Sequence, residues 1–200
     1  MSKYPELERR LIEMRAVEND DNKMLIEGYA IMFDKPTTHQ YGSRKFTETI
    51  KKGALDKTDM KDVPMRYNHN DNVMIMARTR NKSLKLTVDE KGLKVEAELL
   101  DTQSNRDLYK AIKEGLIDKM SFAFRVADGG DTWTFGEKET TREVNNIARL
   151  YDVSVVDTPF YDSTSIYTRS LELLESEEKR LESLNEIELL KEKIKLKGKI

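Results

Sequence analysis

The chain has 200 residues, a formal net charge of −2 and no cysteine. Its length suits one domain of about 150 residues with an appendage, and the near-balanced charge gives no reason to expect nucleic acid as the main partner. The lack of cysteine excludes disulfides and thiolate nucleophiles and favours an intracellular protein. Residues 1–15 have no apolar core, so no signal peptide is expected, and no apolar run is long enough to span a membrane.

The composition changes near Ser170, because all four prolines and eight of the nine glycines precede it. We therefore divide the chain into an N-terminal segment (1–22), a β-rich domain (23–170) and a C-terminal helical tail (171–200).

The first predicted elements in chain order are a strand and a short helix. Residues 23–33 are mostly apolar and predict a strand, in which Gly28 indicates a bulge or bend. Residues 46–55 predict a short helix capped by Thr47. A further strand is expected over 72–80.

Residues 83–100 carry the clearest pattern, with alternating apolar and polar residues on both sides of a turn at 89–92. This alternation predicts a β-hairpin. Residues 101–115 then predict a helix that Asp101 or Thr102 can cap.

A strand is expected over 116–126, followed by a hairpin with a long second arm over 132–160. Many strands with few short helices predict a mainly β fold: a closed or nearly closed antiparallel β-barrel with flanking helices, followed by a C-terminal helix.

The tail carries apolar residues at spacings that place them on one face of a helix. Residues 172–188 hold seven glutamates, whereas 191–199 hold five lysines. Both a partner-binding or coiled-coil-like helix and a solvated helix packed on its own domain fit this pattern. The apolar positions are Leu171, Leu174, Leu181, Leu184, Leu190 and Ile194.

Ser121 is the candidate nucleophile. Strand periodicity places Met120, Phe122 and Phe124 on a core face and Ser121, beside Ala123, on the other. The small neighbours leave room for an extended peptide to lie over the hydroxyl. A serine on the outer face of a strand is nevertheless ordinary, so the pattern alone favours a structural role.

A serine nucleophile needs a base, and histidine is the usual one. The sequence has two histidines, His39 and His69. His69 ends a stretch that begins at Pro64, whereas His39 lies among turn-forming residues. A residue at a strand end is easier to hold in place, which favours His69, although a structural or exposed histidine fits the same position.

Asp152 is the candidate for orienting the base. It lies inside an otherwise apolar strand, where a carboxylate is costly unless it is paired. A partner histidine or an ion pair with arginine or lysine would both satisfy it. Asp157, at the end of the strand, is the alternative acid.

No metal or cofactor is expected. Residues 127–131 lack the lysine of a phosphate-binding loop and the spacing of a dinucleotide fold, so they predict a turn. Residues 69–72 offer oxygen and imidazole ligands but match no calcium loop or zinc motif.

Several of these pieces together resemble the prohead (procapsid maturation) serine protease family of tailed phages. The matching pieces run in order from 27 to 161: EGYAIMFD (27–34), FTETIKKGAL (46–55), PMRYNH (64–69), DEKGLKVEAELLDT (89–102), RDLYKAIKEGLIDKMSFAFRV (106–126) and LYDVSVVDTPFY (150–161).

This resemblance implies a β-barrel like that of the herpesvirus assemblin proteases, with Ser121 as nucleophile and His69 as base. Asp152 is the natural third member, because no histidine follows Ser121; His39 could serve only from a different place in the chain. The oxyanion hole stays unassigned, with backbone N–H groups near 158–161 as a suggestion.

The resemblance also implies a role. The enzyme would cleave scaffold protein, the N-terminal region of the major capsid protein and itself, inside the procapsid in the host cytoplasm. A homodimer and scaffold binding by the C-terminal helix are further expectations, with no nucleic-acid or membrane partner. The alternative is a non-catalytic capsid assembly or scaffolding factor.

Overall fold

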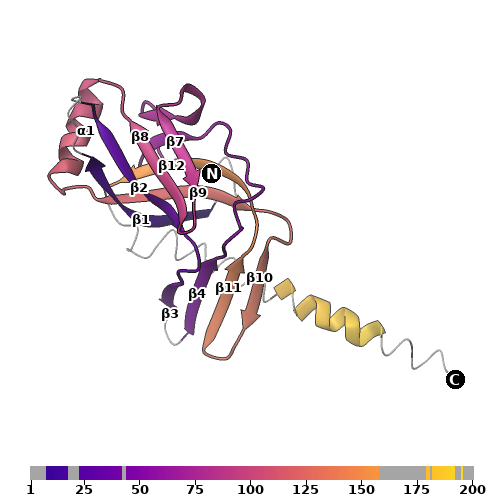
Figure 1. Cartoon of the computed structure of the whole chain (residues 1–200). Coiled ribbons are helices and arrows are strands. Elements are labelled where there is room, and N and C mark those ends of the chain that lie inside the picture. Colours follow the sequence, from indigo (N-terminus) through magenta and orange to yellow (C-terminus); the bar gives the residue numbers. More distant parts are fainter. Residues whose placement is uncertain are drawn as a thin grey trace. The chain divides into compact units, whose positions relative to one another are not determined.

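The computed structural model describes residues 8–17, 23–41, 44–157, 179–180, 182–191 and 195. The chain divides into two compact units, Met1–Pro159 and Phe160–Ile200, and each is described by itself. The described part of the first unit consists of twelve β-strands, one α-helix and one short 3₁₀ turn (Figure 1). The prediction of a mainly β fold is therefore confirmed.

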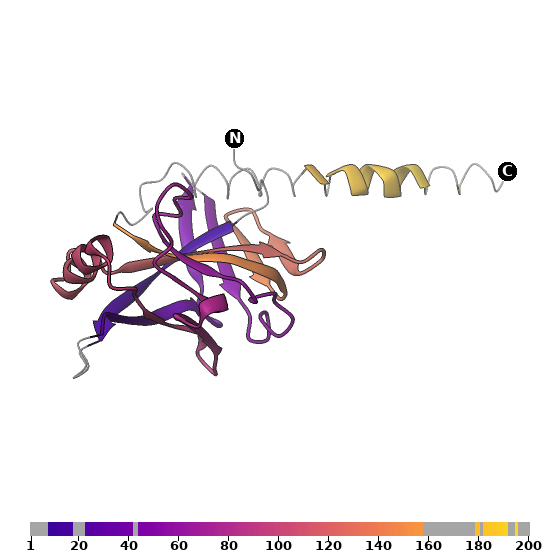
Figure 2. The same ribbon diagram turned by 90° about the horizontal axis from the view of Figure 1, so that it is seen from above.

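Eight strands form one curled sheet (Figure 2). Their order across the sheet is β6-β5-β12-β9-β1-β2-β8-β7. Its edge strands β6 and β7 are consecutive in the chain and joined by the 3₁₀ turn η1, so the sheet is a nearly closed barrel. All neighbours are antiparallel except β12 and β5, which are parallel. The elements are β1 (Glu8–Val17), β2 (Leu25–Met32), β5 (Pro64–Tyr67), β6 (Ala77–Arg78), η1 (Thr79–Asn81), β7 (Leu84–Val88), β8 (Gly92–Glu98), β9 (Lys119–Val126) and β12 (Ile147–Val156).

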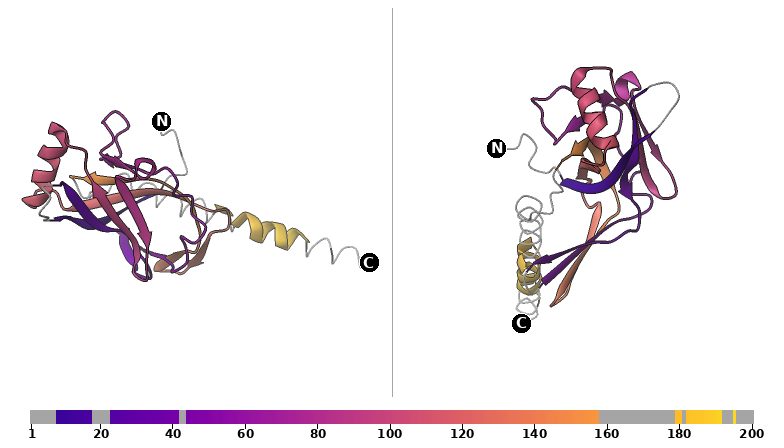
Figure 3. Two further views of the ribbon diagram at one scale, coloured as in Figure 1. Left: turned by 45° about the horizontal axis from the view of Figure 1, so that its top comes forward. Right: turned by 90° about the vertical axis from the view of Figure 1, so that its left-hand side faces the viewer.

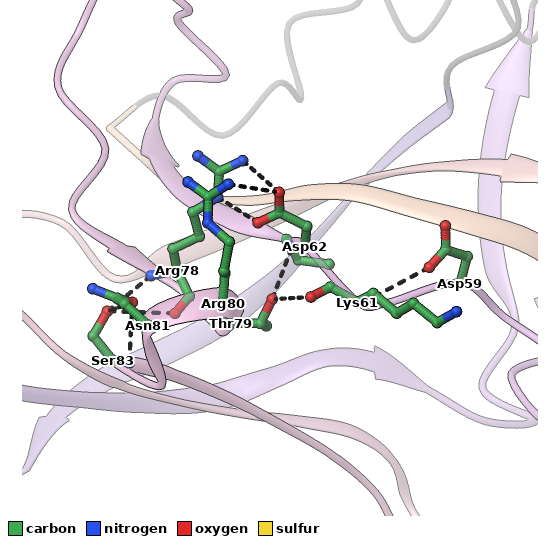
Figure 4. A network of polar contacts seen from close by, with 9 residues as sticks. Asp59, Lys61, Asp62, Arg78, Thr79, Arg80, Asn81 and Ser83 are labelled. Carbon is green, nitrogen blue, oxygen red and sulfur yellow. Dashed lines mark hydrogen bonds and ion pairs between the residues drawn. The ribbon is translucent and has the colours of Figure 1, made fainter.

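Side chains hold the connection between the two edge strands (Figure 4). The backbone N–H of Arg78 donates to the hydroxyl of Ser83 (2.9 Å), which donates in turn to Asn81 (2.7 Å). The Arg78 guanidinium makes two hydrogen bonds to the carboxylate of Asp62 (2.5 and 2.8 Å). The hydrogen bond and ion pair with Arg78 hold the pKa of Asp62 below its usual value.

The remaining four strands form a second sheet that extends away from the barrel (Figure 1). Their order is β10-β11-β4-β3, with bounds Asp131–Phe135, Glu139–Val144, Arg44–Ile50 and Thr37–Tyr41. The chain leaves β11 at residue 144 and enters β12 at 147, so it passes directly from this sheet into the barrel.

The barrel core consists of apolar side chains from every strand of the eight-stranded sheet. Phe122 and Phe124 of β9 are 1% and 0% exposed, and their rings stack at 5.2 Å between centroids. Each fully buried side chain of this kind contributes roughly 1.5–3 kcal/mol through apolar burial. β9 is therefore anchored along its length by its core-facing residues.

The helix α1 (Gln103–Lys113) lies at one end of the barrel, beside β1 (Figure 3). Thr102 is its cap, and the threonine hydroxyl accepts a hydrogen bond from the backbone N–H of Asn105 (3.3 Å). Ile112 is buried in the core, and Tyr109 donates to the carbonyl of Val17 (3.0 Å). The helix and the hairpin formed by β7 and β8 both lie where the sequence predicts them.

Two local predictions are wrong. Residues 46–50 belong to strand β4, not to a helix: their burial alternates, and Thr47 donates to Glu139 (2.8 Å) instead of capping a turn. In the stretch 72–80 only β6 is a strand, and Met74 is 63% exposed. For residues 46–50, pairing with β3 and β11 outweighs the local pattern that predicts a helix.

Three further details differ from the expected organisation. β1, which falls in the segment set apart as 1–22, lies inside the barrel sheet between β9 and β2. Gly28 permits a close approach of β1, since a Cβ there would lie 2.8 Å from the carbonyl oxygen of Glu13, while the irregularity in β2 comes between Tyr29 and Ile31. The long arm expected over 132–160 is divided between β11 and β12.

The second unit is described only as a helical stretch at 179–180, 182–191 and 195. Leu184 and Leu190 of the predicted apolar face are 50% and 58% exposed. Leu171, Leu174, Leu181 and Ile194 lie outside the described residues. Across the described ranges, no helix is long and apolar enough to cross a membrane.

Candidate active site

Ser121 lies near the middle of β9, which has neighbours on both sides. It pairs with Leu11 of β1 and with Ser154 of β12. Its side chain faces away from the apolar core, as the alternation predicts, but it is 2% exposed and Ala123 is 0% exposed. The face that carries the serine is therefore covered as well.

His69 is held in a turn that directly follows β5. Asn68 and His69 both have left-handed backbone conformations, with φ of 50° and 52°. Such conformations cost roughly 1–2 kcal/mol per residue outside glycine, so surrounding contacts must stabilise them. One of these contacts is the hydrogen bond from the Asn68 N–H to the carbonyl of Val155 on β12 (2.8 Å).

Asp157 also holds this turn. Its carboxylate accepts hydrogen bonds from the hydroxyl of Tyr67 (2.5 Å) and the side-chain amide of Asn68 (3.0 Å). Its own N–H donates back to the Asn68 side chain (3.2 Å). The hydrogen bond with Asp157, together with burial, raises the pKa of Tyr67 to about 12. Asp157, the alternative acid, therefore contacts the residues before His69 and fixes the path of the backbone.

The His69 imidazole lies between Ser121 and Asp152. Its Nε2 is 2.7 Å from the Ser121 hydroxyl oxygen, and its Nδ1 is 2.6 Å from a carboxylate oxygen of Asp152. The imidazole is 1% exposed and the Asp152 side chain 11% exposed. The three residues predicted from the sequence thus form one continuous chain of hydrogen bonds.

A bulge in β12 turns Asp152 toward this histidine. Leu150 pairs with Phe124 and Asp152 with Ala123, so Tyr151 is an extra residue opposite β9. Bulges of this kind redirect the side chains that follow them. Leu150 therefore packs in the core, although the simple alternation of the sequence places it on the same face as Asp152.

His39 lies elsewhere. It belongs to β3 of the second sheet, where it pairs with Phe46. Both ring nitrogens of His69 already have partners in Ser121 and Asp152. The structure thus brings His69 into the cluster and leaves His39 out of it.

Ser154 belongs to the cluster and was missed as a functional candidate. It is 0% exposed, and its hydroxyl oxygen lies 2.8 Å from the same Asp152 oxygen that contacts His69. The signal was available, because a residue two positions after Asp152 on a strand shares its face. The oxyanion candidates at 158–161 lie outside the described residues.

The geometry suits general base catalysis. A carboxylate can only accept hydrogen bonds, so an ionised Asp152 selects the tautomer with a proton on Nδ1 of His69. The Nε2 lone pair then faces the Ser121 hydroxyl and can take its proton. Among the described residues no group of three histidine, aspartate or glutamate side chains is placed to hold a metal ion.

Comparison with known protein families identifies the chain. The family described as caudovirus prohead serine protease matches residues 10–178. The chain belongs to this family. As a prohead serine protease it is a capsid maturation protease, and the resemblance seen in the sequence is confirmed.

Two further comparisons complete the picture of this prohead serine protease. No curated protein sequence matches it. The solved structure of the bacteriophage T4 capsid assembly protease, gp21, is similar over 77% of this chain and 98% of that chain, with 11% identity and a TM-score of 0.44.

Proposed function

We propose that this prohead protease is an endopeptidase in which Ser121 is the nucleophile, His69 the general base and Asp152 the residue that orients His69. The observation that carries the proposal is the unbroken contact from the Ser121 hydroxyl through both nitrogens of His69 to Asp152, at 2.7 and 2.6 Å. Such a chain of donors and acceptors is defined by geometry and recurs on unrelated folds.

In the first half of the proposed reaction, the Ser121 oxygen attacks the carbonyl carbon of the scissile peptide. Its proton passes to Nε2 of His69, and the imidazolium that forms is stabilised by the Asp152 carboxylate. The same proton then goes to the leaving amine as the C–N bond breaks, which leaves an ester on Ser121.

In the second half, water attacks the ester and gives its proton to Nε2. The C–O bond to Ser121 breaks, and the serine recovers its proton from His69. Both tetrahedral intermediates need donors for the developing oxyanion. Backbone N–H groups near 158–161 remain our suggestion for this role.

The substrates that we propose are scaffold protein, the N-terminal region of the major capsid protein and the protease itself, cleaved inside the procapsid in the host cytoplasm. We further propose that the C-terminal tail binds scaffold. Leu184 and Leu190 are exposed on its helix and offer an apolar contact. We also propose that the protease forms a homodimer. If a variant truncated after Ser170 entered procapsids as well as the full chain does, the role of the tail would be refuted.

Co-expression with the capsid and scaffold proteins tests the catalytic assignment. Ser121→Ala and His69→Ala should each abolish processing while leaving the circular dichroism spectrum and melting temperature close to those of the wild type. His39→Ala is the matched control and should process normally. Normal cleavage by Ser121→Ala would refute the assignment and favour a non-catalytic assembly factor.

A further inference from the structure

Ser154 lies directly across the β9–β12 pair from Ser121, and its hydroxyl touches the candidate triad at three atoms. The Ser154 oxygen is 2.8 Å from Oδ1 of Asp152, 3.2 Å from the backbone nitrogen of His69 and 3.2 Å from Nδ1 of the same histidine. The residue is 0% exposed, so water does not compete for these contacts.

The number of protons on these groups fixes the direction of each hydrogen bond. A hydroxyl has one proton and two acceptor positions, and a carboxylate only accepts. Ser154 therefore donates to Asp152, while the backbone N–H of His69 donates to Ser154. One hydroxyl thus links the carboxylate that orients the imidazole to the backbone that carries it.

The two hydrogen bonds of Ser154 stabilise the backbone of His69 and the orientation of the Asp152 carboxylate. The left-handed backbone of His69 is unfavourable by itself, and a covered backbone N–H without a partner would add a further cost. Oδ1 of Asp152 receives hydrogen bonds from Ser154 and from the His69 ring, and together these fix the plane of the carboxylate. Ser154 therefore constrains the imidazole in two ways: through the His69 backbone, and through the Asp152 carboxylate that is hydrogen-bonded to Nδ1.

We propose that Ser154 is a positioning residue for the acyl-transfer reaction. It holds Asp152 and the His69 backbone so that Nε2 stays aligned with the Ser121 hydroxyl. It acts through these residues and does not touch the substrate. This inference rests on the proposed function of Ser121, His69 and Asp152.

Steady-state kinetics of Ser154→Ala on a peptide that spans a mapped capsid cleavage site test the inference. We expect kcat to fall by about 10- to 100-fold with KM unchanged, because misplacement of a reacting group by about 1 Å costs on the order of 100-fold. Ser83→Ala is the matched control. The Ser83 hydroxyl accepts from the backbone N–H of Arg78 and donates to Asn81 (Figure 4). Its hydrogen bonds do not involve Ser121, His69 or Asp152, so its loss should leave kcat unchanged.

A second pair of variants separates the hydroxyl from packing. Ser154→Thr keeps the hydroxyl and adds a methyl group. Ser154→Val introduces a side chain of the same shape as threonine that lacks the hydroxyl. We expect Ser154→Thr to retain a kcat at least 10-fold above that of Ser154→Val, since any cost of the added methyl group is common to both. Equal kcat values for the two would overturn the inference.

Nuclear magnetic resonance gives a readout that a purely structural serine would not move. The chain has two histidines, so the Nδ1–H proton of His69 can be assigned with a His69→Ala spectrum. We expect this signal to exchange faster with water in Ser154→Ala than in Ser83→Ala. Wild-type kcat and exchange in Ser154→Ala, with Ser121→Ala inactive, would overturn the role of Ser154 alone. Activity in Ser121→Ala would overturn the proposed function itself.

Discussion

Leu150 and Asp152 are two residues apart on β12, yet their side chains lie on opposite faces of the sheet. Tyr151 between them is an extra residue in the ladder, because Leu150 pairs with Phe124 and Asp152 with the next β9 residue, Ala123. Leu150 packs in the core at 1% exposure, while Asp152 contacts His69. Residues 150–152 therefore both anchor β12 in the core and present the Asp152 carboxylate to His69. Asp152 is thus held by a rigid strand.

The first prediction concerns the charge of Asp152. Asp152→Asn keeps the shape of the side chain but no longer selects the tautomer with a proton on Nδ1 of His69. We expect kcat for peptide cleavage to fall about 10⁴-fold, as it does for the equivalent change in a well-studied serine protease triad. The melting temperature of Asp152→Asn should stay close to that of the wild type.

Asp59→Asn is the control for this variant. Its side chain is 46% exposed, and its carboxylate contacts Arg149 (3.8 Å) and the backbone N–H of Lys61 (3.2 Å). It should cleave at the wild-type rate. Near wild-type cleavage by Asp152→Asn would show that another group orients the histidine.

The second prediction follows from the raised pKa of Tyr67. Its hydrogen bond to Asp157 raises the pKa from an ordinary value of 10.0 to about 12. The folded protein therefore holds this proton after the unfolded chain has released it. The resulting stabilisation is complete below pH 10 and is lost as the pH rises through about 12.

Tyr67→Phe removes this contribution at every pH. The difference in free energy of unfolding between wild type and variant should therefore shrink as the pH rises from about 10 to about 12. Urea unfolding at a series of pH values measures it. Asp157→Asn, which removes the charge at the same contact, should converge with the wild type in the same way. A difference that stays constant across this range would contradict the prediction.

The third prediction concerns the ion pair inside the second sheet. Arg142 and Glu48 are each 3% exposed at the side chain, and their charged atoms are 3.0 Å apart. Arg142→Met leaves the Glu48 carboxylate buried without its guanidinium. We expect the free energy of unfolding to fall by about 3–5 kcal/mol, because removing one partner of a buried ion pair is strongly destabilising.

Arg149→Met is the matched control for that experiment. The Arg149 side chain is 49% exposed and pairs with Asp59 at 3.8 Å, so its loss should cost less than about 1 kcal/mol. Chemical denaturation of both variants gives the comparison. Equal losses would mean that the buried pair contributes no more than an exposed one.

The sequence predicted those parts of the fold that depend on local patterns. The alternation over 83–100 and the cap at Thr102 both describe neighbours in the chain, and both are present. The helix prediction was wrong at 46–50 because these residues form a strand that pairs with β3 and β11. In that strand Glu48 contacts Arg142, which is 94 positions away in the sequence. Local propensity carries no information about such a partner.

The candidate site likewise has some features that the local sequence indicates and others that depend on contacts between distant segments. The scarcity of histidine left His39 and His69 as candidate bases, and the cost of a carboxylate in an apolar strand made Asp152 a candidate. The assignment of Ser121, His69 and Asp152 as one site came from the family resemblance. The bulge at Tyr151 depends on how β12 pairs with β9, and the sequence did not predict it. For Ser154, alternation showed only that it shares a face with Asp152, while its contact with His69 depends on the turn after β5. Alternation alone cannot reveal an extra residue in a ladder.

The most direct measurement of the central claim is covalent labelling with a serine-reactive fluorophosphonate, followed by mass mapping of the modified peptide. We expect a single adduct on Ser121 that is lost in His69→Ala, because the attack on phosphorus needs the histidine as base. Ser83→Ala should be labelled like the wild type. An unlabelled Ser121 in protein that cleaves its peptide substrate, or an adduct that persists in Ser121→Ala, would contradict the account.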